Sequence, residues 1–178
     1  MKRVAIIGSG GAGKSTFARE LGARTGIPVI HLDALFWRPN WTPTPKEEWI
    51  PIEEKLVAED RWIMDGNYGS TQDLRLPRAD TVVFLDLPRL VCIWSVFRRW
   101  ASYWHETRPD MAPGNRENLD PEFLRWIWTY PAKKRPEVLE RLATLPSTTK
   151  VVRLQSRRAM RQFLDAVAPA SGATEAAA

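Results

Sequence analysis

The chain has 178 residues, enough for one domain with a hydrophobic core but too short for two domains of ordinary size. Its formal net charge of +5 favours polyanionic ligands, although charge alone does not separate nucleotides from nucleic acids. Cys92 is the only cysteine, which excludes disulfides within the chain and thiolate metal sites. We therefore expect a single domain over residues 1–168, located in the reducing cytoplasm, with neither a signal peptide nor a membrane span.

A glycine-rich stretch near the start of the chain, IIGSGGAGKST, is the most informative part of the sequence. It follows an apolar run that predicts a buried strand, and Gly8, Gly13, Lys14 and Ser15 fit the spacing G-x-x-x-x-G-K-[ST] at every fixed position. In this motif backbone N–H groups surround phosphates, the lysine reaches the β- and γ-phosphates, and the hydroxyl holds Mg²⁺. The sequence therefore predicts an ATP-binding loop. The residues expected to contact ATP are Gly8, Ser9, Gly10, Gly11, Ala12, Gly13, Lys14, Ser15 and Thr16.

Apolar runs that predict strands alternate along the chain with segments of helical periodicity. This alternation is typical of a parallel sheet whose strands are joined by crossover helices, so we expect an α/β fold. The predicted strands cover residues 4–7, 27–33, 61–66, 81–88 and 150–156.

The segment 90–104 carries apolar side chains at every third or fourth position, which predicts a helix with one buried face. The segment 105–121 has turn formers and mixed charges without periodicity, and loops of that length are usually lids or binding loops. The tail over residues 169–178 is low in complexity and is expected to be disordered. The positions assigned to the buried helix face are Leu90, Ile93, Trp94, Phe97, Ala101 and Trp104.

A second strand beside a phosphate-binding loop normally carries an acid that orients Mg²⁺ or its waters. Asp65 closes the third predicted strand and Asp86 closes the fourth, so the two aspartates compete for this role. We favour Asp65, because Gly66 leaves room for a substrate whereas Leu87 and Pro88 follow Asp86 at the head of a helix. The alternative for Asp65 is an Asp-Gly turn that only reverses the chain.

Asp33 ends the second predicted strand, at the edge of the sheet where open α/β folds bind ligands. There it would accept the proton of an acceptor hydroxyl or neutralise part of the metal's charge; the alternative is an N-cap or surface acid. Trp37 and Trp41 offer aromatic faces and Arg38 a cationic fork, which suit a flat or sugar-bearing acceptor. We expect these four side chains to contact the acceptor, within an acceptor-binding region over about residues 34–60.

Four arginines lie at or within the expected lid. Arg98 and Arg99 close the helix before it, and Arg108 and Arg116 lie inside it. A closing lid would bring guanidinium groups onto a transferring phosphoryl group, so we assign charge stabilisation to Arg98, Arg99 and Arg108. The alternative for each is a solvated surface charge.

Nine tryptophans in a small basic chain raise a second hypothesis about function. A basic, Trp-rich surface would stack single-stranded bases, and the protein would then be a DNA-binding protein that uses ATP as a switch. No helix-turn-helix, zinc finger or isolated basic stripe is visible in the sequence, which argues against nucleic acid as the main partner. We expect most tryptophans to lie in the core and only Trp37 and Trp41 to contact a ligand.

With these residues placed, the chain resembles the small P-loop kinases of the adenylate kinase group, and more closely the bacterial proteins called DNA topology modulation proteins. The closer resemblance covers nearly the whole chain, through IHLDALFWRPNW, RWIMDGNY, TRPDM and EFLRWIW. It implies a P-loop fold of the nucleoside- and nucleotide-kinase type, a three-layer sandwich around a five-stranded parallel sheet in the order 2-3-1-4-5. It also implies a short lid near residues 105–120.

The resemblance also bears on the acceptor. Asp65 in DGNY stands where adenylate kinases carry DGFPR, and Asn67 and Tyr68 replace the stretch with the arginine that grips a monophosphate acceptor. The segment HLDALFW is similar to one in uridine-kinase-like enzymes, whose aspartate activates a sugar hydroxyl. We thus expect Asp65, Gly66 and Asn67 beside the acceptor, and Asp65 with Ser15 at Mg²⁺. The sequence predicts an ATP- and Mg²⁺-dependent kinase for a nucleoside, nucleotide or related hydroxyl acceptor.

Overall fold

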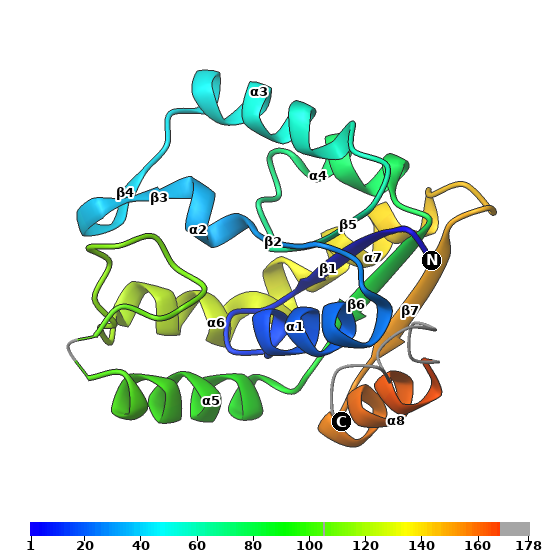
Figure 1. Cartoon of the computed structure of the whole chain (residues 1–178). Helices are drawn as coiled ribbons and strands as arrows, with labels where there is room; N and C mark the ends of the chain where they lie inside the picture. Colours follow the sequence, from blue (N-terminus) through cyan, green and yellow to red (C-terminus); the bar gives the residue numbers. More distant parts are fainter. Residues whose placement is uncertain (105, 168–178) are drawn as a thin grey trace, which may run out of the picture.

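A five-stranded parallel sheet forms the centre of the molecule (Figure 1). The computed structural model describes residues 1–104 and 106–167. The order of the strands across the sheet is β2-β5-β1-β6-β7, which confirms the expected order 2-3-1-4-5 when the five sheet strands are counted along the chain. The strands are β1 (Arg3–Gly8), β2 (Val29–His31), β5 (Trp62–Asp65), β6 (Thr81–Leu85) and β7 (Lys150–Leu154).

Helices cover both faces of this sheet, which makes the expected three layers (Figure 1). Residues of α1, α5, α6 and α8 join one hydrophobic core, and residues of α3, η2 and α7 join the core on the opposite face. The helices are α1 (Lys14–Thr25), α2 (Leu32–Phe36), η1 (Pro39–Trp41), α3 (Lys46–Val57), α4 (Gln72–Arg75), η2 (Leu76–Arg78), α5 (Arg89–Ser102), α6 (Pro121–Lys133), α7 (Arg135–Ala143) and α8 (Arg157–Ala166). A short hairpin, β3 (Trp37–Arg38) with β4 (Thr42–Pro43), stands outside the sheet.

The central strand β1 explains how the two cores form. Val4 and Ile6 belong to one core, and Ala5 and Ile7 to the other, because successive side chains of a strand point to opposite faces. All four are fully buried, as expected for a strand that is covered on both sides. Asp65 pairs with Ile6 of β1 and with His31 of β2, so three neighbouring strands end at the same edge.

The expected buried face of helix α5 is wrong except at Ile93, which is partly buried and packs against one of the two cores. Leu90 is 66% exposed and Trp94 is 69% exposed, whereas Cys92 and Val96 are the buried residues of this helix. The reason is the close approach of α5 to the glycine-rich loop: a Cβ added to Gly11 would lie 2.2 Å from the Cys92 carbonyl oxygen. Only small side chains fit on the helix face that lies so near a backbone, so the bulky ones face outward.

The expected lid corresponds to an irregular segment between α5 and α6. Isolated bridges join Thr107 to Arg116 and Trp104 to Glu117, so the segment folds back on itself. Its role as a lid and the domain boundaries stay predictions. His105 and the predicted disordered tail lie outside the described residues. No helix within the described parts of the chain is long and apolar enough to cross a membrane.

A buried ion pair connects α3 to the loop after β5. Glu53 of α3 and Arg75 of α4 are both fully buried and their side chains contact each other. Arg75 Nη2 also donates to the carbonyl oxygens of Gly66 at 3.2 Å and Asn67 at 3.1 Å. Burial lowers the pKa of Arg75, and the Glu53 carboxylate opposes this effect. The pair therefore fixes the chain directly beyond Asp65.

We expect Glu53→Gln to lower the free energy of unfolding by about 3–5 kcal/mol, because it leaves the buried Arg75 charge without its counter-ion. The matched control is Glu48→Gln on the same helix, whose partner Arg38 is solvent-exposed like Glu48 itself. This control should change the free energy by less than about 1 kcal/mol. Equilibrium urea unfolding measures both variants. Equal losses of unfolding free energy would show that the buried Glu53–Arg75 pair stabilises the fold no more than the exposed pair does.

Candidate active site

The loop between β1 and α1 has a backbone that only glycine tolerates at its tightest points. Gly11 has φ +71° and Gly13 has φ +89°, and an added Cβ would lie 2.2 Å from the Cys92 carbonyl oxygen and 2.5 Å from Arg157 Nη1, respectively. Gly13 caps α1, whose first turn carries no acidic residue. The positive end of the helix dipole is therefore available at the loop, which favours an anion there.

Lys14 is held against this loop. Its ammonium donates to the carbonyl oxygens of Gly8 at 3.1 Å and Ser9 at 3.0 Å. Burial lowers the pKa of Lys14, and the nearby Asp33 and Asp65 carboxylates offset part of that effect. A cation is thus placed beside the backbone N–H groups of the loop, an arrangement that suits a chain of phosphates.

Ser15 and Asp65 meet at the strand edge. The Ser15 hydroxyl donates to Asp65 Oδ2 at 2.8 Å, and His31 Nδ1 lies 2.5 Å from Asp65 Oδ1. The hydrogen bond to Asp65 raises the pKa of His31 above its usual value. A hydroxyl and a carboxylate side by side are oxygen ligands of the kind that Mg²⁺ prefers, so these residues fit that ion.

The competing acid Asp86 is occupied elsewhere. Arg153 Nε donates to Asp86 Oδ2 at 2.8 Å, and Arg135 Nε lies 3.6 Å from the same oxygen. This carboxylate is neutralised by basic side chains on the far side of β6, whereas Asp65 faces the glycine-rich loop. The geometry favours Asp65 over Asp86 as the second acid of the site.

Asp33 lies in helix α2 and not at the end of a strand, which corrects the expected strand over residues 27–33. Strand β2 ends at His31 because the chain turns into α2 at Leu32, whose side chain is buried. At the other end of α2 the Trp37 N–H donates a hydrogen bond to the Asp33 carbonyl oxygen. The side chain still reaches the site: Asp33 Oδ1 accepts a hydrogen bond from the Tyr68 hydroxyl at 2.5 Å. Burial and the Asp33 charge raise the pKa of Tyr68, which keeps this hydroxyl a donor.

An aromatic row extends from Tyr68 to the tip of the β3–β4 hairpin. Phe36 lies 4.6 Å from Tyr68 and 5.1 Å from Trp37, and Trp37 lies 5.7 Å from Trp41, measured between ring centroids. Trp41 has φ +56°, a strained conformation for a bulky residue. Hydrogen bonds to the lid segment hold it there, from Trp41 N to Asn115 Oδ1 at 2.7 Å and from Trp41 Nε1 to the Arg116 carbonyl at 3.0 Å.

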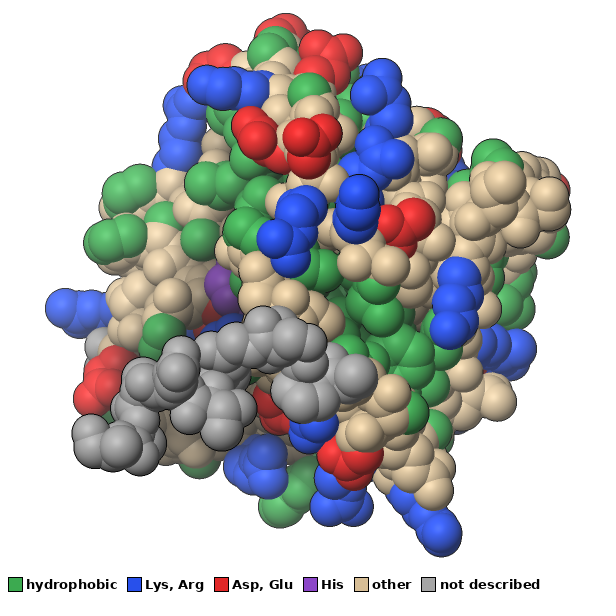
Figure 2. All heavy atoms as spheres, turned by 45° about the vertical axis from the view of Figure 1, so that its right-hand side comes forward, with side chains coloured by type: hydrophobic (Ala, Val, Ile, Leu, Met, Phe, Trp, Pro, Cys, Tyr) green, Lys and Arg blue, Asp and Glu red, His purple; other side chains and the backbone are tan. Residues whose placement is uncertain are grey.

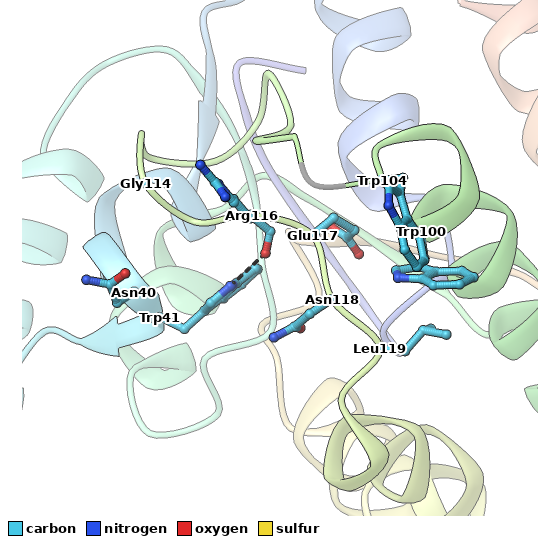
Figure 3. A pocket seen from close by; sticks show the side chains of 9 residues that line it. All are labelled: Asn40, Trp41, Trp100, Trp104, Gly114, Arg116, Glu117, Asn118 and Leu119. Carbon is cyan, nitrogen blue, oxygen red and sulfur yellow. Dashed lines mark hydrogen bonds between the residues drawn. The ribbon is translucent and has the colours of Figure 1, made fainter.

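A cavity of about 680 Å³ opens between this hairpin, the lid segment and the end of α5 (Figure 3). Trp41 stands on one side of it, and Trp100 and Trp104 stand on the other. The size falls within the range of small-molecule sites. The lining residues are Asn40, Trp41, Trp100, Trp104, Gly114, Arg116, Glu117, Asn118 and Leu119.

Two other residues expected at the acceptor have structural partners. Arg38 is exposed and pairs with Glu48 on the surface of α3. Asn67 Oδ1 lies 3.4 Å from the Gly8 N–H, and its carbonyl accepts from Gln72 and Arg75, so Asn67 connects the two loops of the site. The structure thus brings Asp33, Asp65 and Asn67 to the glycine-rich loop and leaves Arg38 outside.

The structure brings two of the three assigned arginines together. Glu117 lies between Arg99 Nη2 and Arg108 Nε, at 2.7 Å from each. Arg98 is exposed on α5 and is not part of this group. Asp110 pairs with Arg108 at 2.9 Å. Burial would raise the pKa of Asp110, but Arg108 and Ser15 outweigh it, so the pKa lies below its usual range.

Sequence reasoning missed four residues of the site: His31, Tyr68, Asp110 and Glu117. His31 was within reach of prediction, because it stands at the end of a strand beside the one that carries Asp65. Asp110 and Glu117 lie in an aperiodic loop, where no pattern indicates which acid meets which arginine. Only the fold of the segment shows that they converge.

Comparisons with known proteins agree with the fold. No protein-family model matches the chain, and no curated protein matches its sequence. Among solved structures, a shikimate kinase from Acinetobacter baumannii in complex with shikimate has a TM-score of 0.55 at 16% identity, covering 93% of this chain and 89% of that one. An unliganded sugar kinase from Janibacter sp. HTCC2649 has a TM-score of 0.52 at 18% identity over 93% and 91% of the two chains.

A third similar structure is a putative kinase from Chloroflexus aurantiacus, with a TM-score of 0.50 at 15% identity over 93% of this chain and 96% of that one. At these identities the likeness concerns the fold. The chain is therefore an α/β protein with a five-stranded parallel sheet and a P-loop, folded like these small-molecule kinases.

Proposed function

We propose that this protein is an ATP- and Mg²⁺-dependent kinase, similar to the adenylate kinase group, that phosphorylates a hydroxyl of a nucleoside, nucleotide or related small molecule. The observation that carries the proposal is the meeting of Lys14, the Ser15–Asp65 pair and Asp33 at one edge of the sheet. The shared fold with sugar and shikimate kinases supports it. We place the activity in the cytoplasm, since the one cysteine is a buried free thiol.

The phosphate side of the reaction would use the loop and the lid. Backbone N–H groups of residues 10–14 and the Lys14 ammonium would bind the β- and γ-phosphates. Ser15 and Asp65 would hold Mg²⁺, which neutralises charge on the phosphates when it is bound. Arg99 and Arg108 would stabilise the charge that spreads over the moving phosphoryl group. Catalysis of this kind depends on positioning and charge more than on covalent chemistry.

The acceptor side would use Asp33. Tyr68 binds Oδ1, and among the described residues no hydrogen bond reaches Oδ2. That oxygen would orient the acceptor hydroxyl and take its proton late in the transfer. Phe36, Trp37 and Trp41 would offer apolar faces to a flat or sugar-bearing acceptor.

The alternative, a nucleotide-gated DNA-binding protein, has no comparable observation in its favour. On the face shown in Figure 2, basic side chains are interspersed with acidic ones and do not gather into one stripe. A protein that binds the phosphate backbone of DNA needs a surface on which basic side chains are concentrated. We therefore keep the kinase as the single proposal.

Lys14→Ala should lower ATP turnover by about 10² or more, as losing one preorganised stabilising charge commonly does. The fold should persist, since Lys14 contacts only loop carbonyls. Lys150→Ala is the matched control, because this exposed lysine begins β7 at the opposite edge of the sheet. Calorimetric ATP binding and turnover assays measure both variants. Wild-type affinity and turnover in Lys14→Ala would refute the assignment of the loop.

Asp33→Asn should lower kcat by about 10² to 10⁴, the usual range for a general base, while ATP affinity stays near wild type. The assay first screens ATP consumption with nucleosides, nucleotides and sugars, and then measures kcat with the acceptor found. Asp165→Asn, an exposed acid of α8, is the matched control. Excess Mg²⁺ that restores the Asp33→Asn rate would assign the residue to the metal, and an unchanged kcat would remove it from the mechanism.

A further inference from the structure

Glu117 occupies an unusual position between two arginines of the lid. Its Oε1 lies 2.7 Å from Arg99 Nη2, and its Oε2 lies 2.7 Å from Arg108 Nε. The Glu117 side chain is 2% exposed, against 25% for Arg99 and 9% for Arg108. One buried carboxylate therefore joins a helix residue to a loop residue.

The two guanidinium groups repel each other, and the Glu117 carboxylate opposes this repulsion. Burial and the neighbouring Arg108 charge both lower the pKa of Arg99, and Glu117 opposes them. The Arg99 charge also contributes to the lowered pKa of Lys14, although burial is the larger cause. Like charges repel strongly in such a partly desolvated place, and a shared carboxylate offsets the repulsion.

The contacts with Glu117 leave donors available on both arginines. Arg99 Nε donates to Glu117 Oε1, with Nη2 at ion-pair distance from the same oxygen, and Arg108 donates Nη1 to Asp110 while its Nε makes an ion pair with Glu117 Oε2. Among the described residues, no hydrogen bond or ion pair involves Arg99 Nη1 or Arg108 Nη2. A guanidinium has five N–H donors in a fixed fork, so each arginine keeps donors for a phosphoryl oxygen.

The backbone holds Glu117 at this position. Its N–H donates to the Glu106 carbonyl at 2.9 Å, and Glu117 also forms an isolated parallel bridge with Trp104. In Figure 3 the Glu117 side chain lies on the side of Trp100 and Trp104, while the neighbouring Arg116 extends to the other side of the segment. The alternation of an extended chain thus sends one residue to the arginines and the next one outward.

We infer that Glu117 is a positioning residue that brings Arg99 and Arg108 together onto the γ-phosphoryl group when the lid lies over the loop. The inference rests on the proposed kinase function. It gives Glu117 a role in that reaction although its side chain would touch neither ATP nor the acceptor. Glu117 acts through the two arginines: it fixes one edge of each guanidinium and directs the other edge to the phosphate. Misplacing such groups by an ångström is costly in rate.

The test compares Glu117→Gln with Glu106→Gln, an exposed glutamate of the same segment whose side chain is outside the cluster. The readout is the ratio of affinities for a non-hydrolysable ATP analogue and for ADP, which needs no acceptor. Glu117→Gln should lower this ratio by about 10-fold to 100-fold, the effect of losing a hydrogen bond to a charged group. Glu106→Gln should leave it unchanged. An equal ratio in Glu117→Gln and wild type would overturn the inference.

A variant that lacks both arginines tests whether Glu117 acts through them or has a direct or structural role of its own. In Arg99→Ala/Arg108→Ala, adding Glu117→Gln should cause no further loss, because the residues through which it acts are absent. A further loss of the same size would overturn the inference. If Glu117→Gln does not fold by circular dichroism, Glu117→Asp replaces it: the charge is kept, but the shorter side chain no longer spans both arginines.

The same measurements separate this inference from the proposed function. A wild-type protein that binds neither nucleotide overturns the kinase and the role of Glu117 with it. A wild-type protein that binds both nucleotides equally leaves the kinase standing but overturns the inference, since the arginines then do not reach the γ-phosphoryl group.

Discussion

The hydrogen bond between Ser15 and Asp65 is the contact on which the candidate site depends. It joins the loop after β1 to the end of β5, two strands that are neighbours in the sheet. Parallel strands end at the same edge, so a loop from one strand and an acid from the next can meet without any other connection. His31 extends the contact to β2, because it pairs with Asp65 in register and reaches the same carboxylate.

Two further segments are built around this centre. On one side Tyr68 holds Asp33 near Lys14, and the buried Glu53–Arg75 pair fixes the chain between Asp65 and Tyr68. The irregular segment between α5 and α6 contributes Asp110, which pairs with Arg108, and Glu117, which pairs with both Arg99 and Arg108. These acids therefore have a structural part, because each one holds a positive or hydrogen-bonding group near the candidate site.

The aromatic residues show how close packing overrides sequence pattern. A helix with apolar residues at regular spacing usually buries them, yet α5 turns Cys92 and Val96 inward and exposes Leu90 and Trp94. At Gly11 the bare loop backbone lies directly against the α5 backbone at Cys92, so no large ring fits between the loop and the helix there. The glycine-rich loop thus decides which face of its neighbouring helix is buried.

The sequence by itself predicted the α/β fold, the glycine-rich loop and a preference for Asp65 over Asp86, and its resemblance to P-loop kinases implied the strand order. The fold class, the loop and the preference for Asp65 follow from local patterns: buried apolar runs, glycines at fixed spacing, and an acid at a strand end. Only the tertiary structure decided that Asp33 lies in a helix bound to Tyr68, that Arg38 points to Glu48, and that Glu117 joins two arginines. Those contacts connect segments distant in sequence or lacking periodicity, and side-chain pairing of that kind depends on how the loops pack.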